Sequence, residues 1–132
     1  MSPDDISLGE RAAALKASLD VKPGARASSS PGPGGRAPTA LIYKVAGKMF
    51  AILGIRKEPF VILKCDPQLA EVMRDQYQGV GHRSHLDRRY WISVRLNADV
   101  PPAEVERLAA HSYDLVCASL TRKQKAELAN LV

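Results

Sequence analysis

Long apolar runs and aromatic side chains are scarce in this sequence of 132 residues, of which 5% are aromatic. The apolar stretches, such as 60–63, fall far short of the ~20 residues that a membrane-spanning helix requires, so we expect no membrane segment. The N-terminus carries Asp4 and Asp5 instead of a basic segment followed by an apolar stretch, so it does not resemble a secretory signal. We therefore expect the protein in the cytoplasm.

Cysteine is also rare, because the chain has Cys65 and Cys117 and no Cys-x-x-Cys spacing. Cytoplasmic proteins seldom hold structural disulfides, and each cysteine lies in an apolar stretch. These features predict two buried thiols rather than a disulfide.

The remaining composition is that of an ordinary globular protein, with 45% hydrophobic and 25% charged residues. Domains cluster at roughly 100 to 150 residues, so we predict a single domain over 1–132. The net charge of +5 is unevenly spread: residues 23–66 contain seven basic and two acidic residues, whereas 98–132 contain four and five. A local positive field attracts polyanions without conferring sequence preference.

Apolar residues at helical spacing predict a first helix over 6–20. Between Pro23 and Pro38, eleven of sixteen residues are Pro, Gly or Ser. Such a segment cannot bury enough apolar surface to hold a fixed structure. We predict a flexible Pro/Gly/Ser-rich loop at about 23–39.

Strand signals follow this loop. Runs at 41–46 and 48–54 flank Ala46-Gly47, where glycine can take the positive φ of a tight turn, and they predict an antiparallel hairpin. A third β-type run at 60–65 extends the hairpin to a three-stranded meander. Over 90–96, apolar residues alternate with others, as in a half-buried strand. The predicted buried face of the last strand is Tyr90, Ile92, Val94 and Leu96, opposite Trp91, Ser93 and Arg95.

Asp66-Pro67 predicts a helix start, because Asp accepts hydrogen bonds from the free N–H groups of a first turn and Pro suits the first helical position. Gly79 and Gly81 are predicted to end this helix. Its predicted buried stripe is Leu69, Val72, Met73 and Tyr77.

A long helix is predicted from Pro101 to about Leu120, and Thr121 with Gln124 resembles a capping box at the start of a short last helix. Strands in meander order, a helix, another strand and more helices indicate an α+β fold, an antiparallel β-sheet with helices packed on one face. The predicted apolar face of the long helix is Val105, Leu108, Ala109, Leu115 and Val116.

Four segments resemble the MmcQ/YjbR family in order and spacing, over roughly residues 40–125. They are 44–51 (KVAGKMFA), 63–67 (LKCDP), 90–94 (YWISV) and 111–116 (HSYDLV). The resemblance implies a CyaY-like fold and DNA binding by a double-wing arrangement of hairpins.

The chain departs from the family pattern in two places. Relatives often have an aromatic, proline-rich segment before the hairpin, whereas 28–35 reads SSSPGPGG. Before the tryptophan, relatives often have Tyr-His-Met-Asn-Lys, whereas 84–89 reads SHLDRR. The missing tyrosine and the added arginine imply a changed ligand preference.

The main candidate site is a basic surface with one exposed indole. Arg and Lys neutralise phosphates, and an exposed Trp91 can stack on an unpaired base for about 1–3 kcal/mol. An equally weighted alternative is that Trp91 packs under a helix and the charges only solubilise the sheet. The candidate nucleic-acid-binding residues are Lys44, Lys48, Arg56, Lys57, Arg83, Arg88, Arg89, Trp91 and Arg95.

Metal binding by His82, His85, Asp87 and His111 is disfavoured, because a site needs three or four converging ligands. Frataxin-type iron handling would need a dense acidic ridge, which the first helix lacks. We expect no metal and no cofactor.

Catalysis is not supported either. His111 and Ser112 are adjacent on a helix, where their side chains diverge by about 100°. Lys48 follows a glycine but precedes Met49 in a hairpin, unlike the lysine of a P-loop.

Our leading hypothesis is a non-enzymatic, monomeric nucleic-acid-binding module that contacts phosphates through basic β-hairpins. The alternative is a small protein-interaction or scaffold protein that uses its sheet face. A small-ligand or enzymatic pocket between sheet and helices is a third, weaker hypothesis.

Overall fold

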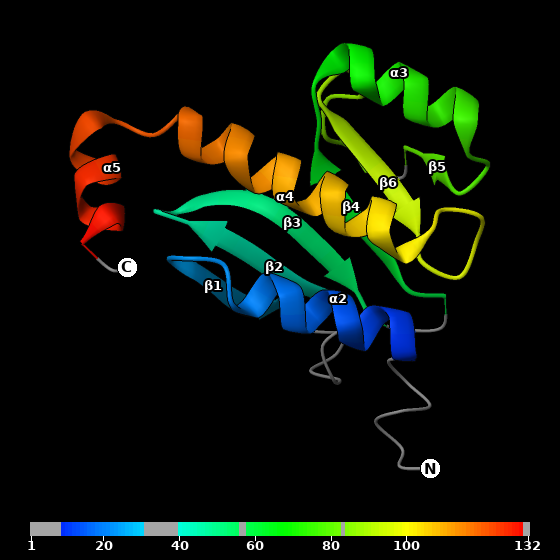
Figure 1. Ribbon diagram of the computed structural model, residues 1–132, viewed down its shortest axis with the longest axis horizontal. Helices are drawn as coiled ribbons and strands as arrows, with labels where there is room; N and C mark the ends of the chain where they lie inside the picture. Colours follow the sequence, from blue (N-terminus) through cyan, green and yellow to red (C-terminus); the bar gives the residue numbers. More distant parts are fainter. Residues whose placement is uncertain (1–8, 31–39, 56–57, 83, 131–132) are drawn as a thin grey trace.

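The computed structural model describes residues 9–30, 40–55, 58–82 and 84–130. These residues form four helices and six strands (Figure 1). The helices are α2 (Glu10–Asp20), α3 (Pro67–Gln76), α4 (Pro102–Ala118) and α5 (Arg122–Ala129). The strands are β1 (Ala25–Ser30), β2 (Ala40–Val45), β3 (Lys48–Gly54), β4 (Phe60–Lys64), β5 (Val80–Gly81) and β6 (Trp91–Arg95).

The strands form one antiparallel sheet in the order β1-β2-β3-β4-β6-β5. In Figure 1, α2 (blue) and α4 (orange) lie over the same side of the sheet. Helix α2 contacts β1 and α4, helix α4 contacts β2, β3 and β4, and α3 contacts the edge strand β5. The predicted fold class, an antiparallel sheet with helices on one face, is confirmed.

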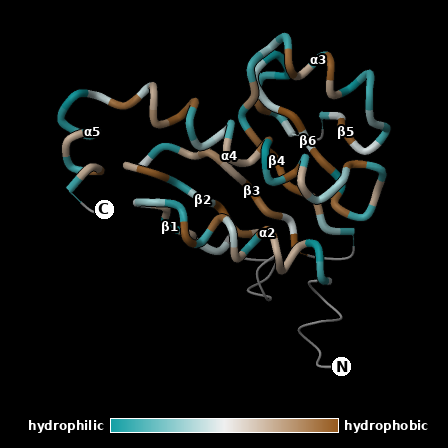
Figure 2. Tube along the Cα trace, in the orientation of Figure 1, coloured by the Kyte–Doolittle hydropathy of each residue, from teal (hydrophilic) through white to brown (hydrophobic). Residues whose placement is uncertain are grey.

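The core lies between the sheet and the two long helices, and Figure 2 shows the hydrophobic residues concentrated along the central strands. Leu15 and Leu19 of α2 and Leu108 of α4 are at most 2% exposed. Full burial of a side chain of this size contributes roughly 1.5–3 kcal/mol. Of the predicted face of α4, Leu115 is only half-buried, and the other members are buried: Val105, Leu108, Ala109 and Val116.

Strand β1 corrects the prediction of a flexible loop at 23–39. Residues Ala25 to Ser30 pair one by one with Val45 to Ala40 of β2. A Ser-rich segment can form this strand because its hydrogen bonds come from the backbone of β2, which side-chain composition does not reveal. Residues 31–39 lie outside the described residues.

The predicted β2–β3 hairpin is confirmed. Ala46 has φ 50° and Gly47 has φ 79°, so both turn residues take the positive φ of a type I′ turn. Tyr43 pairs with Ala51 and the next residue, Lys44, pairs with Met49, so Phe50 of β3 has no partner in β2. This irregularity is a β-bulge.

Next to the bulge, β3 is no longer paired with β4, and the hydroxyl of Ser112 in α4 bridges the two strands. Their pairing ends at Ala51 and Leu63, so the next residues, Phe50 and Lys64, do not complete the ladder. Ser112 Oγ instead accepts from Lys64 N at 2.9 Å and donates to Phe50 O at 2.6 Å. Its side chain is fully buried, and the bridge satisfies the two backbone groups that are left without ladder partners.

The predicted start of α3 is confirmed, because Asp66 Oδ2 accepts from Gln68 N at 3.1 Å and from Leu69 N at 3.2 Å. The predicted end is wrong, since the helix stops at Gln76, before both glycines. Val72, predicted to be buried, is 52% exposed, and Ala70 takes a buried position instead.

Gly79 has a different role from the predicted helix stop. The two oxygens of Asp99 accept from Gln78 N and Gly79 N, each at 2.7 Å. A Cβ atom at Gly79 would lie 2.9 Å from Asp99 Oδ1 and 2.8 Å from Ala98 Cβ. Glycine is needed here because the carboxylate packs directly on the backbone.

Strand β6 partly follows the predicted alternation. Ile92, Val94 and Leu96 are buried as predicted, but Tyr90 is 41% exposed because it precedes the strand in a turn. Ser93 is 2% exposed although it was predicted on the solvent face. It lies between two neighbouring strands, opposite Ile62 of β4 and Gly81 of β5.

The C-terminal helices agree with the prediction. Helix α4 begins at Pro102, and Thr121 and Gln124 form the predicted capping box at the start of α5. None of the described helices is long and apolar enough to span a membrane.

We predict that Ser112→Ala lowers the free energy of unfolding by on the order of 3 kcal/mol, because it leaves Lys64 N–H and Phe50 C=O buried without partners. Urea denaturation checks this value. Ser119→Ala is the matched control, since the Ser119 hydroxyl only bonds Val116 O at the end of the same helix. Equal effects of the two substitutions would contradict the bridging role of Ser112.

We also predict an acid-dependent contribution from Asp99. The N–H groups of Gln78 and Gly79 hold the pKa of its carboxyl below the usual value. A carboxyl whose pKa is lower in the folded than in the unfolded protein stabilises the fold above about pH 4. This stabilisation is lost as the pH falls through the folded-state pKa. Asp99→Asn, which keeps one acceptor for two N–H groups, should lower the melting temperature at pH 7. The difference from the unsubstituted protein should shrink toward zero near pH 2, and a pH-independent difference would refute this assignment.

Candidate nucleic-acid interface

Strand register divides the basic residues between the two faces of the sheet. Residues opposite each other in an antiparallel pair share a face, and successive residues alternate. Lys48 pairs with Val45, which is fully buried on the helix side. Lys44 pairs with Met49 of β3 and with Arg26 of β1, on the opposite side. We call this side the second face.

Lys48 therefore does not join Lys44, although both were predicted in one site. Its Nζ donates to the carbonyl oxygen of Ser119, at the end of α4, at 3.1 Å. This contact directs the Lys48 ammonium toward the helix layer.

Arg26 and Lys44 form a cationic pair on the second face at the β1–β2 edge. The two residues are directly opposite each other and exposed. They line a pocket of about 330 Å³ together with Ser28 and the turn residues Ala46 and Gly47. The ion pairs among the described residues are Lys16–Asp20, Arg89–Asp87 and Arg107–Glu104, so neither cation has a carboxylate partner there.

Arg26 was missed at the sequence level because its segment was predicted to be a loop. The only signal that could have revealed it is the alternation of Arg26 and Ser28 with Ala25 and Ala27, which is weak in a short Ser-rich run.

A second cavity lies beside the end of β4 and the start of β6, next to α4. Lys64 and Trp91 are directly opposite each other, and Trp91 is half-buried. They line a cleft of about 460 Å³ with Tyr90, and its remaining wall comes from the β4–α3 connection and α4. We call this the Trp91 cleft; it is lined by Lys64, Cys65, Asp66, Pro67, Tyr90, Trp91 and Leu115.

The segment that leads into β6 is held by Arg74 of α3. Arg74 Nη2 donates to the carbonyl oxygens of Arg88 at 2.7 Å and of Trp91 at 3.0 Å. Burial, followed by the nearby Arg88 charge, lowers the pKa of the Arg74 guanidinium. These bonds fix the backbone on either side of Tyr90.

Arg88 and Arg89 are both exposed beside the Trp91 cleft, but their surroundings differ. Arg89 forms two bonds with Asp87, Nη2 to Oδ2 at 2.9 Å and Nε to Oδ1 at 3.3 Å, and its guanidinium lies 5.4 Å from the Tyr90 ring centre. The hydrogen bonds from Arg89 lower the pKa of Asp87. Arg88 has no such carboxylate partner among the described residues.

Arg95 lies at the other end of β6, opposite Phe60. It shares the second face with Lys44 but is several residues away along the strands, and its Nη2 donates to Gln78 O at 3.3 Å. Arg56, Lys57 and Arg83 lie outside the described residues.

His82, His111 and Cys65 have structural surroundings. His111 Nε2 accepts from Asp66 N at 3.2 Å, and a ring nitrogen of His82 lies 2.6 Å from Leu86 O. Among the described residues no three His, Cys, Asp or Glu side chains cluster so as to hold a metal ion. Both cysteines are free thiols, but only Cys65 is fully buried; burial raises its pKa to about 11.

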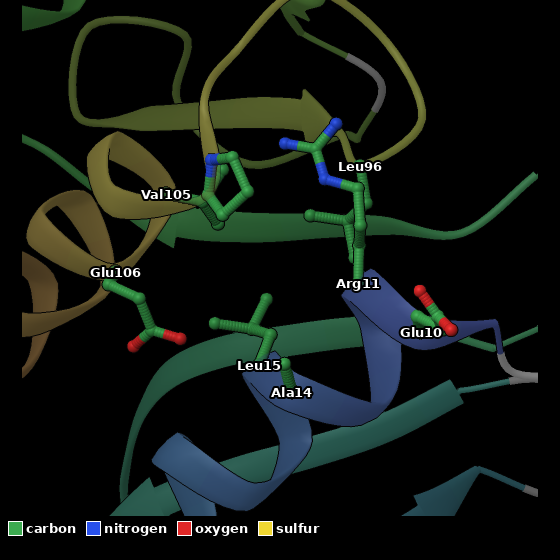
Figure 3. Close-up of a pocket in the computed structure, with 8 residues that line it drawn as sticks. Glu10, Arg11, Ala14, Leu15, Leu96, Val105 and Glu106 are labelled. Atoms are coloured by element: carbon green, nitrogen blue, oxygen red, sulfur yellow. The ribbon is translucent and has the colours of Figure 1, made fainter.

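A third cavity lies between α2 and α4 and is unsuited to an anion (Figure 3). Its floor is apolar, with Leu15, Leu96 and Val105, and the carboxylates of Glu10 and Glu106 flank it. The guanidinium of Arg11 extends away from this floor and donates to the carbonyl oxygens of Ala98 and Val100. This arginine ties α2 to the loop before α4.

Comparison with known proteins gives the family. The YjbR family model matches residues 21–115. Protein YjbR of Escherichia coli K12 is 30% identical over 89 residues, which cover 67% of this chain and 75% of YjbR. Protein YbdF of E. coli O157:H7 is 28% identical over 85 residues, which cover 64% of this chain and 70% of YbdF. Both relatives are called uncharacterized proteins.

Solved structures agree with this result. Deinococcus radiodurans protein DR2400, described as a DUF419 domain, superposes with a TM-score of 0.75 at 26% identity, covering 87% of this chain and 85% of that protein. A Pseudomonas syringae protein shares the fold with a TM-score of 0.61 at 19% identity, covering 87% of this chain and 98% of the other. With a family model that matches most of its length, the chain belongs to the MmcQ/YjbR family.

Proposed function

We propose that this protein is a non-enzymatic, cytoplasmic nucleic-acid-binding module that acts without a cofactor. It contacts phosphates through the basic residues of the second face, and the β1–β2–β3 strands supply the first contact. The observation that carries the proposal is the Arg26–Lys44 pair, two opposed cations without a carboxylate partner among the described residues.

Like charges directly opposite each other destabilise a sheet, so this pair costs free energy when no anion is bound. A phosphate oxygen between the two side chains relieves the repulsion and gains two charge-assisted hydrogen bonds. The Ser28 hydroxyl lines the same pocket and adds a neutral donor. An anion is therefore the ligand that this pocket is best suited to hold.

The cations of the second face extend beyond this pair. Lys64 of β4 is opposite Trp91, and Trp91 is on the same side of β6 as Arg95, so Lys64 also lies on the second face. Arg88 is exposed just before β6. Three strand spacings separate β2 from β6, which is about 14 Å. That distance covers several nucleotide steps of a strand, which rise about 3.4 Å each when stacked. A polyanion therefore suits this row better than a single small anion.

We predict that Arg26→Gln combined with Lys44→Gln weakens binding to a mixed-sequence DNA on the order of tenfold at low salt. The slope of log affinity against log salt should fall by about 0.7 for single strands or about 0.9 for duplex, because the one phosphate held between the two side chains is lost. Fluorescence anisotropy of labelled DNA at several salt concentrations measures both quantities.

The matched control is Arg122→Gln combined with Lys123→Gln, which removes the same two residue types from exposed positions of helix α5, where neither has an ion-pair partner among the described residues, and leaves the second face intact. This variant should retain most of the affinity and the salt slope. Absence of binding to DNA at low salt, or equal losses in the two double variants, would reject the proposed function.

A further inference from the structure

We infer that the Trp91 cleft receives an unpaired base, so that the protein prefers single-stranded nucleic acid to duplex. This inference rests on the proposed function and assigns its substrate class. Three observations support it: a cavity, two aromatic residues that line it, and a cation without a carboxylate partner. All three are found where β4 ends and β6 begins.

The walls of the cleft match the face of a base. Trp91 and Tyr90 are consecutive residues that both line it, and Tyr90 is 41% exposed. Leu115 of α4 and Pro67 of α3 add apolar surface to its lining. Its volume of about 460 Å³ falls within the range of small-molecule sites, roughly 300–1,000 Å³.

Lys64 gives the cleft its polarity. Its side chain is opposite Trp91 in the register, so the Cβ atoms of the two residues are about 5 Å apart. A base stacked on the indole would place its own phosphate within reach of the Lys64 ammonium. No carboxylate forms an ion pair with Lys64 among the described residues. Asp66, on the same rim, directs Oδ2 to the N–H groups of Gln68 and Leu69.

The aromatic walls are held in place before any ligand binds. Arg74 bonds the carbonyl oxygens of Arg88 and Trp91, and Cys65 N donates to Tyr90 O at 2.7 Å. A stacking platform whose backbone is already fixed loses less conformational entropy on binding, which increases affinity. The guanidinium of the half-buried Arg74 is thus a positioning group for Tyr90 and Trp91.

A duplex cannot use this cleft. Paired bases present only their edges in the grooves, and their faces are covered by neighbouring bases in the stack. Base faces are free in a single strand, where stacking on an aromatic side chain adds affinity for any base. Phosphate contacts at Arg26 and Lys44 are available to both forms, so the cleft is the element that discriminates between them.

The test uses the intrinsic fluorescence of Trp91, because it is the only tryptophan of the chain. The full chain is titrated with a mixed-sequence single strand, with its duplex, and with a single strand of abasic sites that keeps the phosphates. We expect the normal single strand to quench Trp91 emission and to bind on the order of tenfold or more tighter than the other two. The abasic strand should bind without quenching.

Tyr90→Ser removes one aromatic wall at an exposed position, and Lys64→Gln removes the cation. Tyr90→Ser should reduce the preference for the normal over the abasic strand. Lys64→Gln should weaken the binding of both strands, because both keep the phosphate that Lys64 contacts. Thermal melting verifies that both variants fold. Val72→Ser is the matched control, because Val72 is exposed on α3 and does not line the cleft.

The outcomes separate this inference from the proposed function. If single strand, abasic strand and duplex bind equally well and Trp91 emission does not change, the base-binding inference is overturned while phosphate binding stands. If none of the three binds at low salt, the inference and the proposed function are both overturned.

Discussion

The hydroxyl of Ser112 is the contact on which the arrangement of the sheet depends. The bulge at Phe50 ends the β3–β4 ladder one residue early, and the hydroxyl bridges the two backbone groups that remain. Helix α4 therefore packs against the point where β3 and β4 diverge. The cleft beside Trp91 opens at that end of β4 and has Leu115 of the same helix as one wall. One buried hydroxyl thus connects the bulge, the helix and the candidate site.

The two faces of the sheet differ in charge as well as in packing. On the helix side, cations are used within the fold: Arg11 bonds two loop carbonyls, and Lys48 bonds the end of α4. On the second face, Arg26, Lys44 and Lys64 have no carboxylate partners among the described residues. Alternation along the strands separates these two groups of cations. Arg95 is an exception on the second face, because its Nη2 donates to Gln78 O.

Local signals in the sequence predicted local structure well. The Ala46-Gly47 turn, the Asp66 cap and the Thr121 capping box each depend on residues within a few positions, and all were confirmed. Strand β1 was not foreseen, because its order comes from pairing with β2. Arg26 was missed together with this strand.

Lys44 and Lys48 were predicted in one site, although a two-residue hairpin places Lys48 opposite Val45. The length of the turn alone implies this register. The sequence pointed to Trp91 as a stacking residue but did not give the lining of its cleft, because α3 and α4 supply walls from distant parts of the sequence.

The central claim is that the second face, from the Arg26–Lys44 pair to the Trp91 cleft, is the nucleic-acid surface. Its most direct test is a heteronuclear NMR titration of the isotope-labelled chain with a short single-stranded oligonucleotide at low salt. Shift changes confined to the side chains of Arg26, Lys44 and Lys64 and to the Trp91 indole would agree with it. Changes centred on the cavity between α2 and α4, around Arg11 and Glu106, with the second face unaffected, would contradict it.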